Sequence, residues 1–487
     1  VAIDTNAAGN DGTVTFSSTI DSAAGTSREL DIVSATGNVT VTGAIGATTA
    51  LATLDINEAG GDGDITLTSN IGADASNPGV TGVTRIGNAA TADLNLNGTV
   101  YTTGGATTYA SAGTDLGGAS PTFTTSADTI TFTGNVTVAD GTLTVNSVGG
   151  LIDFEGSILG TSDEVLVLNA NAATDGASTN EKVIVAAIGS GNQIHSVNIT
   201  GRDGITLEGN ITTSNKASNN VSFTGPVAIN AATVAIDTNA AGNDGTVTFS
   251  STIDSATGTS RNLDLVSGGA KITVDGAIGA TTALATLDVN AAAGAGDIEL
   301  ANIGAGSKGV TGTSTIGNSA TNLLTLDGTV YFTDVVDYEA KADGSIAISS
   351  AENVTFTTDT DAMTFSTAPV VLSGDGTTTM TTGAGAGVIE FASTIDGTGG
   401  AGENLTLESG TGNITVTGAI GASSALGNLT MNTSGDGDIT LTSNIGADAN
   451  NAGAAVTNIG NLDTDDLNLD GTIYTTSGTT SYTSDET

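Results

Sequence analysis

The strongest constraint on the fold of this chain is an exact internal repeat. Residues 234–256 repeat residues 1–23, VAIDTNAAGNDGTVTFSSTIDSA, without a single change. A repeat of this kind indicates a protein built from similar segments that stack on one another and share one core. The number of domains then follows from the repeats, and not from the length of 487 residues.

Three further families of segments recur, always in the same order. They are GNVTVTGAIGA at 37–47 with variants at 270–280 and 412–422, DGDITLTSNIGAD at 62–74 and 436–448, and LNLNGTVYTT at 94–103 with variants at 324–333 and 467–476. They predict one continuous β-solenoid over residues 1–487, with large repeat units at about 14–103, 151–215, 247–333 and 388–476 joined by variable coils. Because both ends fall inside this pattern, we expect the chain to belong to something longer.

The short runs inside each unit alternate between apolar and polar residues, as half-buried strands do. Val39, Val41, Leu54 and Ile56 are expected to point into the core, with Thr40, Thr42 and Asp55 on the outside. Such short strands bury an apolar face only by stacking, which predicts a parallel β-helix of roughly 19 or 20 coils. A sandwich of antiparallel hairpins is the competing fold, but Asn-Gly hairpin turns are few.

The charge limits the partners that the chain can bind. Asp and Glu number 52 against 9 Lys and Arg, a formal net charge of −43. Such a surface repels nucleic-acid phosphate and anionic lipid, so no nucleic-acid partner is expected. There is no long apolar run, and we expect no membrane insertion within this chain. Cysteine is absent, which excludes disulfides and thiolate chemistry.

The segments Gly37–Ala47 and Asp62–Asp74, their copies, and the LxxLxIN-like runs ending at Asn57 and Asn290 resemble a known class of sequence. They are similar to the β-strand repeats of large bacterial surface proteins and to filamentous-haemagglutinin-like right-handed parallel β-helices. The resemblance implies a secreted or cell-surface shaft and no catalytic residue. We therefore expect an extracellular structural or adhesive protein, either a stiff acidic shaft or a self-assembling filament. Its expected partners are other copies of itself, stacked end to end, or surface glycans.

Two acidic corners are candidate cation sites. Asp62 and Asp64 flank one glycine, as do Asp436 and Asp438. Calcium requires several such oxygen ligands, so calcium is the one cofactor that the sequence suggests. The calcium β-roll pattern, Gly-Gly-x-Gly-x-Asp, is matched only with its Asp one place early. A solvated acidic corner is the alternative interpretation of these four residues.

Two other functions are also compatible with a β-helix. Carbohydrate-active β-helix enzymes, whether polysaccharide lyases or hydrolases, cluster acidic and basic residues on an outer face. Here the single histidine, His195, lies near Arg202 and Asp203, but the basic residues are scattered, and we predict no enzyme. An ice- or mineral-binding face would need unbroken ranks of Thr-x-Thr pairs. The ranks that begin at Thr13/Thr15 and Thr40/Thr42 are interrupted, for example at Asn95/Asn97.

Tyrosines form one further surface candidate. Tyr101, Tyr331 and Tyr474 occupy the same position of the repeat. On an outer face, tyrosine rings stack on sugars. The alternative is that they pack against the core at a corner of the coil.

Overall fold

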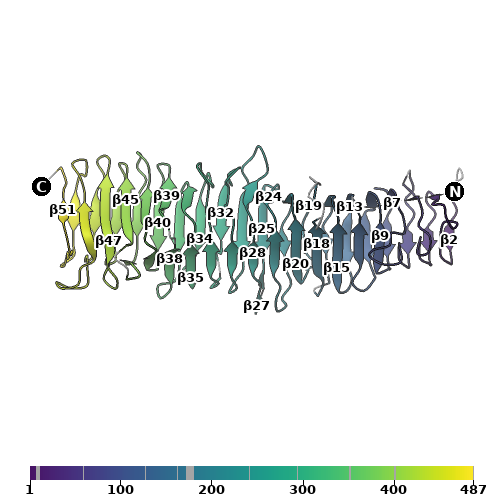
Figure 1. The fold of residues 1–487 in the computed structure, drawn as a ribbon, viewed down its shortest axis with the longest axis horizontal. Helices are drawn as coiled ribbons and strands as arrows, with labels where there is room; N and C mark the ends of the chain where they lie inside the picture. The colour runs from purple at the N-terminus through teal and green to yellow at the C-terminus, as the bar shows by residue number, and fades with distance from the viewer. Residues whose placement is uncertain are drawn as a thin grey trace. The chain divides into compact units, whose positions relative to one another are not determined.

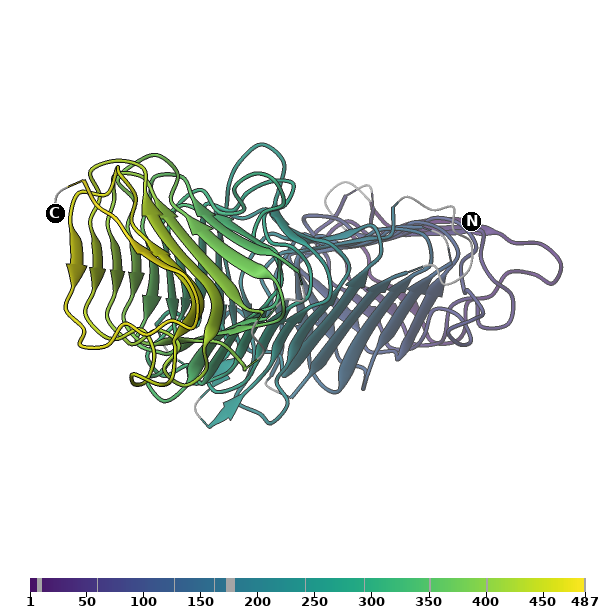
Figure 2. The same ribbon diagram turned by 60° about the vertical axis from the view of Figure 1, so that its left-hand side comes forward.

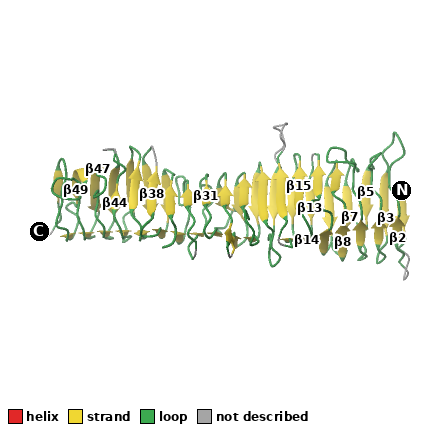
Figure 3. Cartoon of the chain, turned by 90° about the horizontal axis from the view of Figure 1, so that it is seen from below, coloured by secondary structure: helices red, strands yellow, loops and turns green. Residues whose placement is uncertain are grey.

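A computed structural model describes residues 1–6, 11–58, 60–126, 128–161, 163–171, 180–240, 242–292, 294–349, 352–399 and 402–485. The described residues form strands joined by turns and loops, with no helix among them (Figure 3). The strands stack in parallel as a β-solenoid of about 18 turns, close to the number expected from the sequence. The chain divides into two compact units, Val1–Gly245 and Thr246–Thr487.

In the first unit the strands form three parallel sheets (Figure 1). One sheet has the order β1 (Ala2–Asp4), β3 (Glu29–Val33), β5 (Thr53–Ile56), β7 (Thr84–Gly87), β10 (Thr107–Ala110), β13 (Ile130–Phe132), β16 (Ile152–Phe154), β19 (Lys182–Val185), β21 (Gly204–Leu207), β24 (Val227–Ile229). The second contains β2 (Val14–Phe16), β4 (Val39–Val41), β6 (Ile65–Leu67), β8 (Asp93–Leu96), β11 (Gly113–Leu116), β14 (Asn135–Val138), β17 (Ile158–Leu159). The third contains β9 (Val100–Thr103), β12 (Thr122–Thr125), β15 (Thr142–Ser147), β18 (Val165–Ala170), β20 (Ser196–Gly201), β23 (Val221–Thr224). Further pairs are the parallel β22 (Ile211–Thr212) with β25 (Thr233–Asp237) and the antiparallel β26 (Asn239–Ala240) with β27 (Asn243–Asp244).

The second unit repeats this arrangement, and its stacked parallel strands are seen most clearly in Figure 2. One sheet contains β28 (Val247–Phe249), β31 (Ile272–Val274), β33 (Ile298–Leu300), β35 (Leu323–Leu326), β38 (Ser345–Ser349), β41 (Val370–Ser373), β44 (Ile395–Asp396). The second contains β30 (Asn262–Val266), β32 (Thr286–Val289), β34 (Ser314–Gly317), β37 (Val336–Glu339), β40 (Met363–Ser366), β43 (Ile389–Phe391), β46 (Ile414–Val416), β48 (Ile439–Leu441), β50 (Leu467–Leu469). The third contains β36 (Val330–Thr333), β39 (Val354–Thr358), β42 (Thr377–Thr381), β45 (Asn404–Ser409), β47 (Leu426–Thr433), β49 (Ala454–Ile459), β51 (Thr480–Tyr482). Strand β29 (Ile253–Ser255) lies in this unit but outside these three sheets.

The alternation read from the sequence sets the direction of the side chains. Val39, Val41, Leu54 and Ile56 are at most 1% exposed, as predicted. Apolar residues also follow them in register on the next coil, since Val39 pairs with Ile65 and Ile56 pairs with Ile86. Each coil therefore adds one layer to a continuous dry core, whose burial is the main stabilising term of the fold.

A third row of core residues runs through Ile45, in the repeated segment at 37–47. Ile20, Ile45, Ile71 and Tyr101 form successive parallel bridges between coils. In later coils of the same unit this row lengthens into the strands β9 and β12. Most coils therefore have three core-facing rows.

Buried aromatic rings form stacks at one part of each core. In the first unit, Tyr101 stacks on Phe123 with ring centroids 4.6 Å apart. In the second unit, Tyr331 stacks on Phe356 at 4.5 Å. Tyr101 and Tyr331 are only 1% exposed, so the core-packing interpretation of these two tyrosines is confirmed and the surface interpretation is wrong for them.

Candidate functional site

The acidic corners proposed as cation sites directly precede strands β6 and β48. Asp62 and Asp436 are exposed to solvent at the corner, and Asp64 and Asp438 are partly buried. The backbone N–H of Asp64 donates to Asn38 Oδ1 at 3.1 Å, and that of Asp438 donates to Asn413 Oδ1 at 3.0 Å. Asn413 Nδ2 donates back to Asp438 Oδ2 at 3.2 Å. The inner aspartate of each corner is thus tied to the asparagine of the preceding coil.

Donors already engage both carboxylate oxygens of Asp438, since the Asp466 N–H also donates to its Oδ1 at 3.3 Å. No group of three or more His, Cys, Asp or Glu that could hold a metal ion occurs within the part of the chain that the structure describes. The structure brings Asp62 beside Asp64, and Asp436 beside Asp438, only as neighbouring corner residues. Calcium binding at these four residues stays a prediction.

Other acidic residues link one coil to the next. Asp21 Oδ1 accepts hydrogen bonds from the backbone N–H groups of Thr48 and Thr49, at 2.8 and 3.0 Å. Asp254 and Asp396 accept the same pair of bonds in their copies of the repeat. This role was not predicted from the sequence, although the repeated Ser-Thr-Ile-Asp run carried the signal.

Asparagines make a second set of links between coils. Asn70 Oδ1 accepts the backbone N–H groups of Thr99 and Val100, at 2.9 and 3.1 Å. Asn302 and Asn444 each accept two backbone N–H groups of the following coil in the same way. The outer corners of the solenoid are therefore held by repeated side-chain bonds as well as by the backbone ladder.

A local acidic turn also recurs. Asp74 accepts hydrogen bonds from the Ser76 N–H at 2.7 Å and from Asn77 Nδ2 at 2.8 Å. These bonds favour the ionised carboxylate, so they lower the pKa of Asp74. Asp448 makes the equivalent bonds and its pKa is lowered for the same reason. Much of the acidic surface therefore takes part in loop and coil geometry.

The residues considered for catalysis are engaged in local contacts. His195 Nε2 lies 2.9 Å from the carbonyl oxygen of Ala217. Arg202 Nε lies 2.6 Å from Glu181 Oε2 and 3.6 Å from Asp203 Oδ1. Because Glu181 is fully buried, the guanidinium of Arg202 balances its charge. These contacts favour a structural role for His195 and Arg202.

Threonines form an in-register column on the outer face of the third sheet of the second unit. Thr355 pairs with Thr379, Thr379 with Thr406, and Thr406 with Thr430, on four successive coils. The next neighbour in the column is Asn458.

The threonine triplets singled out from the sequence form a shorter rank. Thr15, Thr40 and Thr66 align on successive coils of the first unit. The rank then ends at Asn95, where an interruption was predicted from the sequence.

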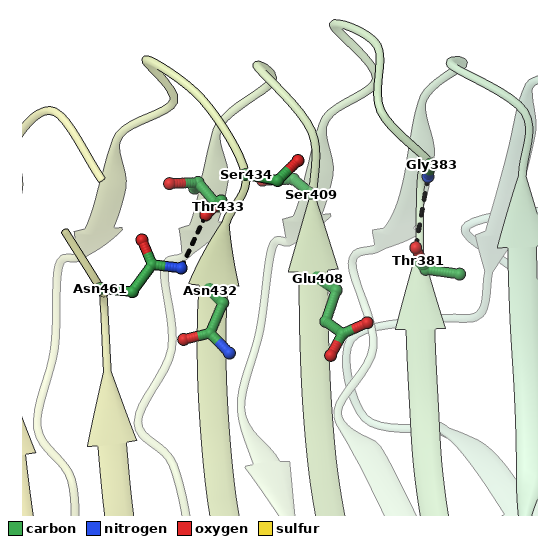
Figure 4. Close-up of a pocket in the computed structure, with 8 residues that line it drawn as sticks. All are labelled: Thr381, Gly383, Glu408, Ser409, Asn432, Thr433, Ser434 and Asn461. Atoms are coloured by element: carbon green, nitrogen blue, oxygen red, sulfur yellow. Dashed lines mark hydrogen bonds between the residues drawn. The ribbon is translucent and has the colours of Figure 1, made fainter. Parts of the chain in front are cut away.

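A polar hollow of about 280 Å³ lies at the end of the strands that carry the threonine column (Figure 4). It is lined by Thr381, Gly383, Glu408, Ser409, Asn432, Thr433, Ser434 and Asn461. Glu408 is in register with Thr381 on one side and with Asn432 on the other. Figure 4 shows the Glu408 and Asn432 side chains projecting from adjacent strands, while Asn461 Nδ2 donates to the Thr433 carbonyl oxygen at 2.8 Å.

The hollow exists because this copy of the repeat departs from the others. Asn432 corresponds to Asn57 and Asn290, which are fully buried, have positive φ angles of 51° and 49°, and bond to Ser34 and Ser267. The loop from Asn432 to Asp438 is one residue shorter than the loop from Asn57 to Asp64. The shorter loop keeps residues 426–433 in one extended strand, so Asn432 is partly exposed and Thr433 is buried instead.

Comparisons of the chain with protein-family models, with curated proteins and with solved structures each find no match. No helix among the described residues is long and apolar enough to cross a membrane. The fold and the geometry of the outer faces therefore carry the functional argument.

Proposed function

We propose that this chain is a stiff shaft of an extracellular or cell-surface structural protein. The single observation that carries the proposal is the recurrence of side-chain bonds between successive coils. Asp21, Asp254 and Asp396 make the same two bonds to the next coil, and each adds to the backbone ladder that already joins the coils. Bonds that recur from coil to coil stiffen the solenoid along its whole length, and stiffness and length are the properties that a shaft requires.

The resemblance to filamentous-haemagglutinin-like surface proteins supports the same role, as does the acidic surface. A net charge of −43 suits a medium in which cations screen repulsion between coils and between molecules. The proposed partners are copies of the same chain, joined end to end, or glycans of a neighbouring surface. The chain would act as a filament in the first case and as a spacer in the second.

Electron microscopy of the purified chain tests the proposal, with calcium and with a chelator. Straight rods of uniform width are expected, and end-to-end fibres would identify the filament form. Loss of the fibres in the chelator would support cation binding at Asp62, Asp64, Asp436 and Asp438. Gold-labelled antibodies on intact cells of the source organism should decorate the outer surface. Particles that bend freely between coils, or labelling confined to the cell interior, would contradict the proposal.

The threonine column favours a second candidate function, binding to ice. Its four hydroxyl-bearing residues repeat at the spacing of parallel strands, about 4.8 Å, which gives a regular array. Thermal hysteresis of the chain should then fall when Thr379 and Thr406 are both replaced by Lys. A chain with no measurable hysteresis would remove this function and leave the shaft unaffected.

A further inference from the structure

We propose that the hollow around Glu408 and Asn432 is a binding site for one ring of a neutral saccharide, recognised through adjacent hydroxyl groups. The inference deepens the proposed function, and it rests on that function only for the statement that glycans are partners. The site itself is argued from three features: two polar side chains without protein partners, the absence of other ligand chemistry in the lining, and its restriction to one copy of the repeat.

The first feature is that Glu408 and Asn432 lack protein partners. In the described part of the chain, neither side chain makes a hydrogen bond or ion pair with another residue. This contrasts with the amides and carboxylates at other corners, such as Asn70 and Asp21, which bond to the next coil. The carboxylate offers two acceptor oxygens, and the amide offers both donors and an acceptor.

These groups suit a pair of neighbouring sugar hydroxyls. Glu408 and Asn432 are in register on adjacent parallel strands, so their backbones are about 4.8 Å apart. Two hydroxyls on adjacent carbons can donate to the carboxylate of Glu408, and one can accept from the amide of Asn432. The hydroxyl of Thr381, which already accepts the Gly383 N–H at 3.2 Å, can still donate to the ligand.

The second feature is the absence of basic, aromatic and large aliphatic side chains from the lining. None of its eight residues is basic, and it contains one carboxylate, so an anion such as phosphate or a uronic acid is disfavoured. None is aromatic or a large aliphatic residue, so an apolar ligand would gain little. A lone calcium ion would need more oxygen ligands than one carboxylate and a few neutral groups supply. A volume of about 280 Å³ is small for a binding site and fits one sugar ring rather than a longer segment.

The third feature is that the site occurs in one copy only. Glu408 stands where the other copies have Val33 and Val266, directly before the serine that follows each strand. The loop shortened by one residue turns Asn432 outward in this same copy. Two independent changes therefore bring a carboxylate and an amide together at a single position of an otherwise repeated surface.

Saturation-transfer NMR on the whole chain tests the inference. The probes are methyl β-glucoside, methyl α-mannoside and methyl β-galactoside, with tetrahydropyran-2-methanol as a ring that lacks the adjacent hydroxyls. At least one glycoside should give a signal that the hydroxyl-poor ring does not give. Glu408→Val, which restores the residue of the other copies, and Asn432→Ala should each weaken binding about tenfold or more.

The matched control is the double variant Thr406→Ala, Thr430→Ala, which changes the same two strands one outward position away from the hollow. It should leave binding unchanged. The inference is overturned if no glycoside exceeds the hydroxyl-poor ring, if binding survives Glu408→Val, or if the control variant weakens binding equally. In each of these cases the rods expected by electron microscopy would still form, so failure of the site is distinguishable from failure of the shaft.

Discussion

Asn432 lies directly opposite Glu408 on neighbouring parallel strands, and both side chains point away from the core. In the two other copies the asparagine of this position is turned inward and bonds to a serine of the preceding coil. In this copy the loop after Asn432 is one residue shorter and the strand continues through Asn432 and Thr433, so these two side chains alternate outward and inward.

Restoring the missing loop residue should close the hollow. Inserting one glycine between Gly435 and Asp436 reproduces the spacing from Asn57 to Asp64. We expect Asn432 to return to the buried position, where it can bond to Ser409, and glycoside binding to fall about tenfold or more. Saturation-transfer NMR measures the binding, and urea unfolding checks that the fold is intact. Unchanged binding in a folded insertion variant would show that loop length does not control Asn432.

The glycine column at the acidic corner should tolerate no side chain. A Cβ on Gly63 would lie 2.3 Å from the carbonyl oxygen of Gly37, on the coil before it. Gly63→Ala is therefore expected to lower the free energy of unfolding by about 1–3 kcal/mol, because the two backbones must move apart. Gly113→Ala is the control, since nothing lies within 4 Å of the added Cβ. Equal urea midpoints for the two variants would contradict the steric argument.

The aromatic stack should stabilise its own coils more than distant ones. Phe132 is fully buried and stacks on Tyr109 at 4.9 Å and on Phe154 at 4.7 Å. Phe132→Ala should cost about 3–5 kcal/mol, and Phe132→Leu should cost less. In a solenoid each coil contacts chiefly its neighbours, so amide exchange should rise in residues 107–154 and stay unchanged in 1–6 and 11–58. A uniform rise in amide exchange across the first unit would contradict the expectation that the loss of stability stays local.

The sequence allowed the core to be predicted, because Val39, Val41, Leu54 and Ile56 alternate with polar residues and the period of two has only one inward face. It predicted the short threonine rank at Thr15, Thr40 and Thr66, but not the longer threonine column of the second unit. The threonines of the column, Thr355, Thr379, Thr406 and Thr430, lie in segments of unequal spacing, and their alignment depends on the loop lengths between strands.

The Glu408–Asn432 pair was hidden because strand β47 continues through Asn432 in this copy, where the loop to Asp438 is one residue shorter. A comparison of the copies position by position, with Val33 set against Glu408, could have found the carboxylate. It could not have shown that Asn432 turns outward, since that follows from how the strand continues through residues 426–433.

One carboxylate of the second unit, that of Asp337, is partly buried. Asp337 lies on the outer face of β37, where Ser366 Oγ donates to its Oδ1 at 2.7 Å. Burial raises the pKa of Asp337, and the charges of Glu339 and Glu390 raise it further. A carboxyl whose pKa is raised by folding stabilises the fold only while it is protonated. That contribution is complete below the ordinary pKa of aspartate and is lost as the pH rises through the raised pKa.

Asp337→Asn should therefore raise the urea midpoint at pH 7, and the gain should shrink as the pH falls below the range in which Asp337 ionises. The amide introduced there keeps an acceptor for Ser366 but carries no charge against Glu339 and Glu390. Asp343→Asn removes one negative charge from the same unit at a side chain that is 85% exposed. Its ion pair with Lys341 at 3.5 Å contributes little at such exposure, so the variant separates this local effect from relief of the net charge. An equal gain from Asp343→Asn, or a gain from Asp337→Asn that does not depend on pH, would show that the three carboxylates on this face do not act on one another.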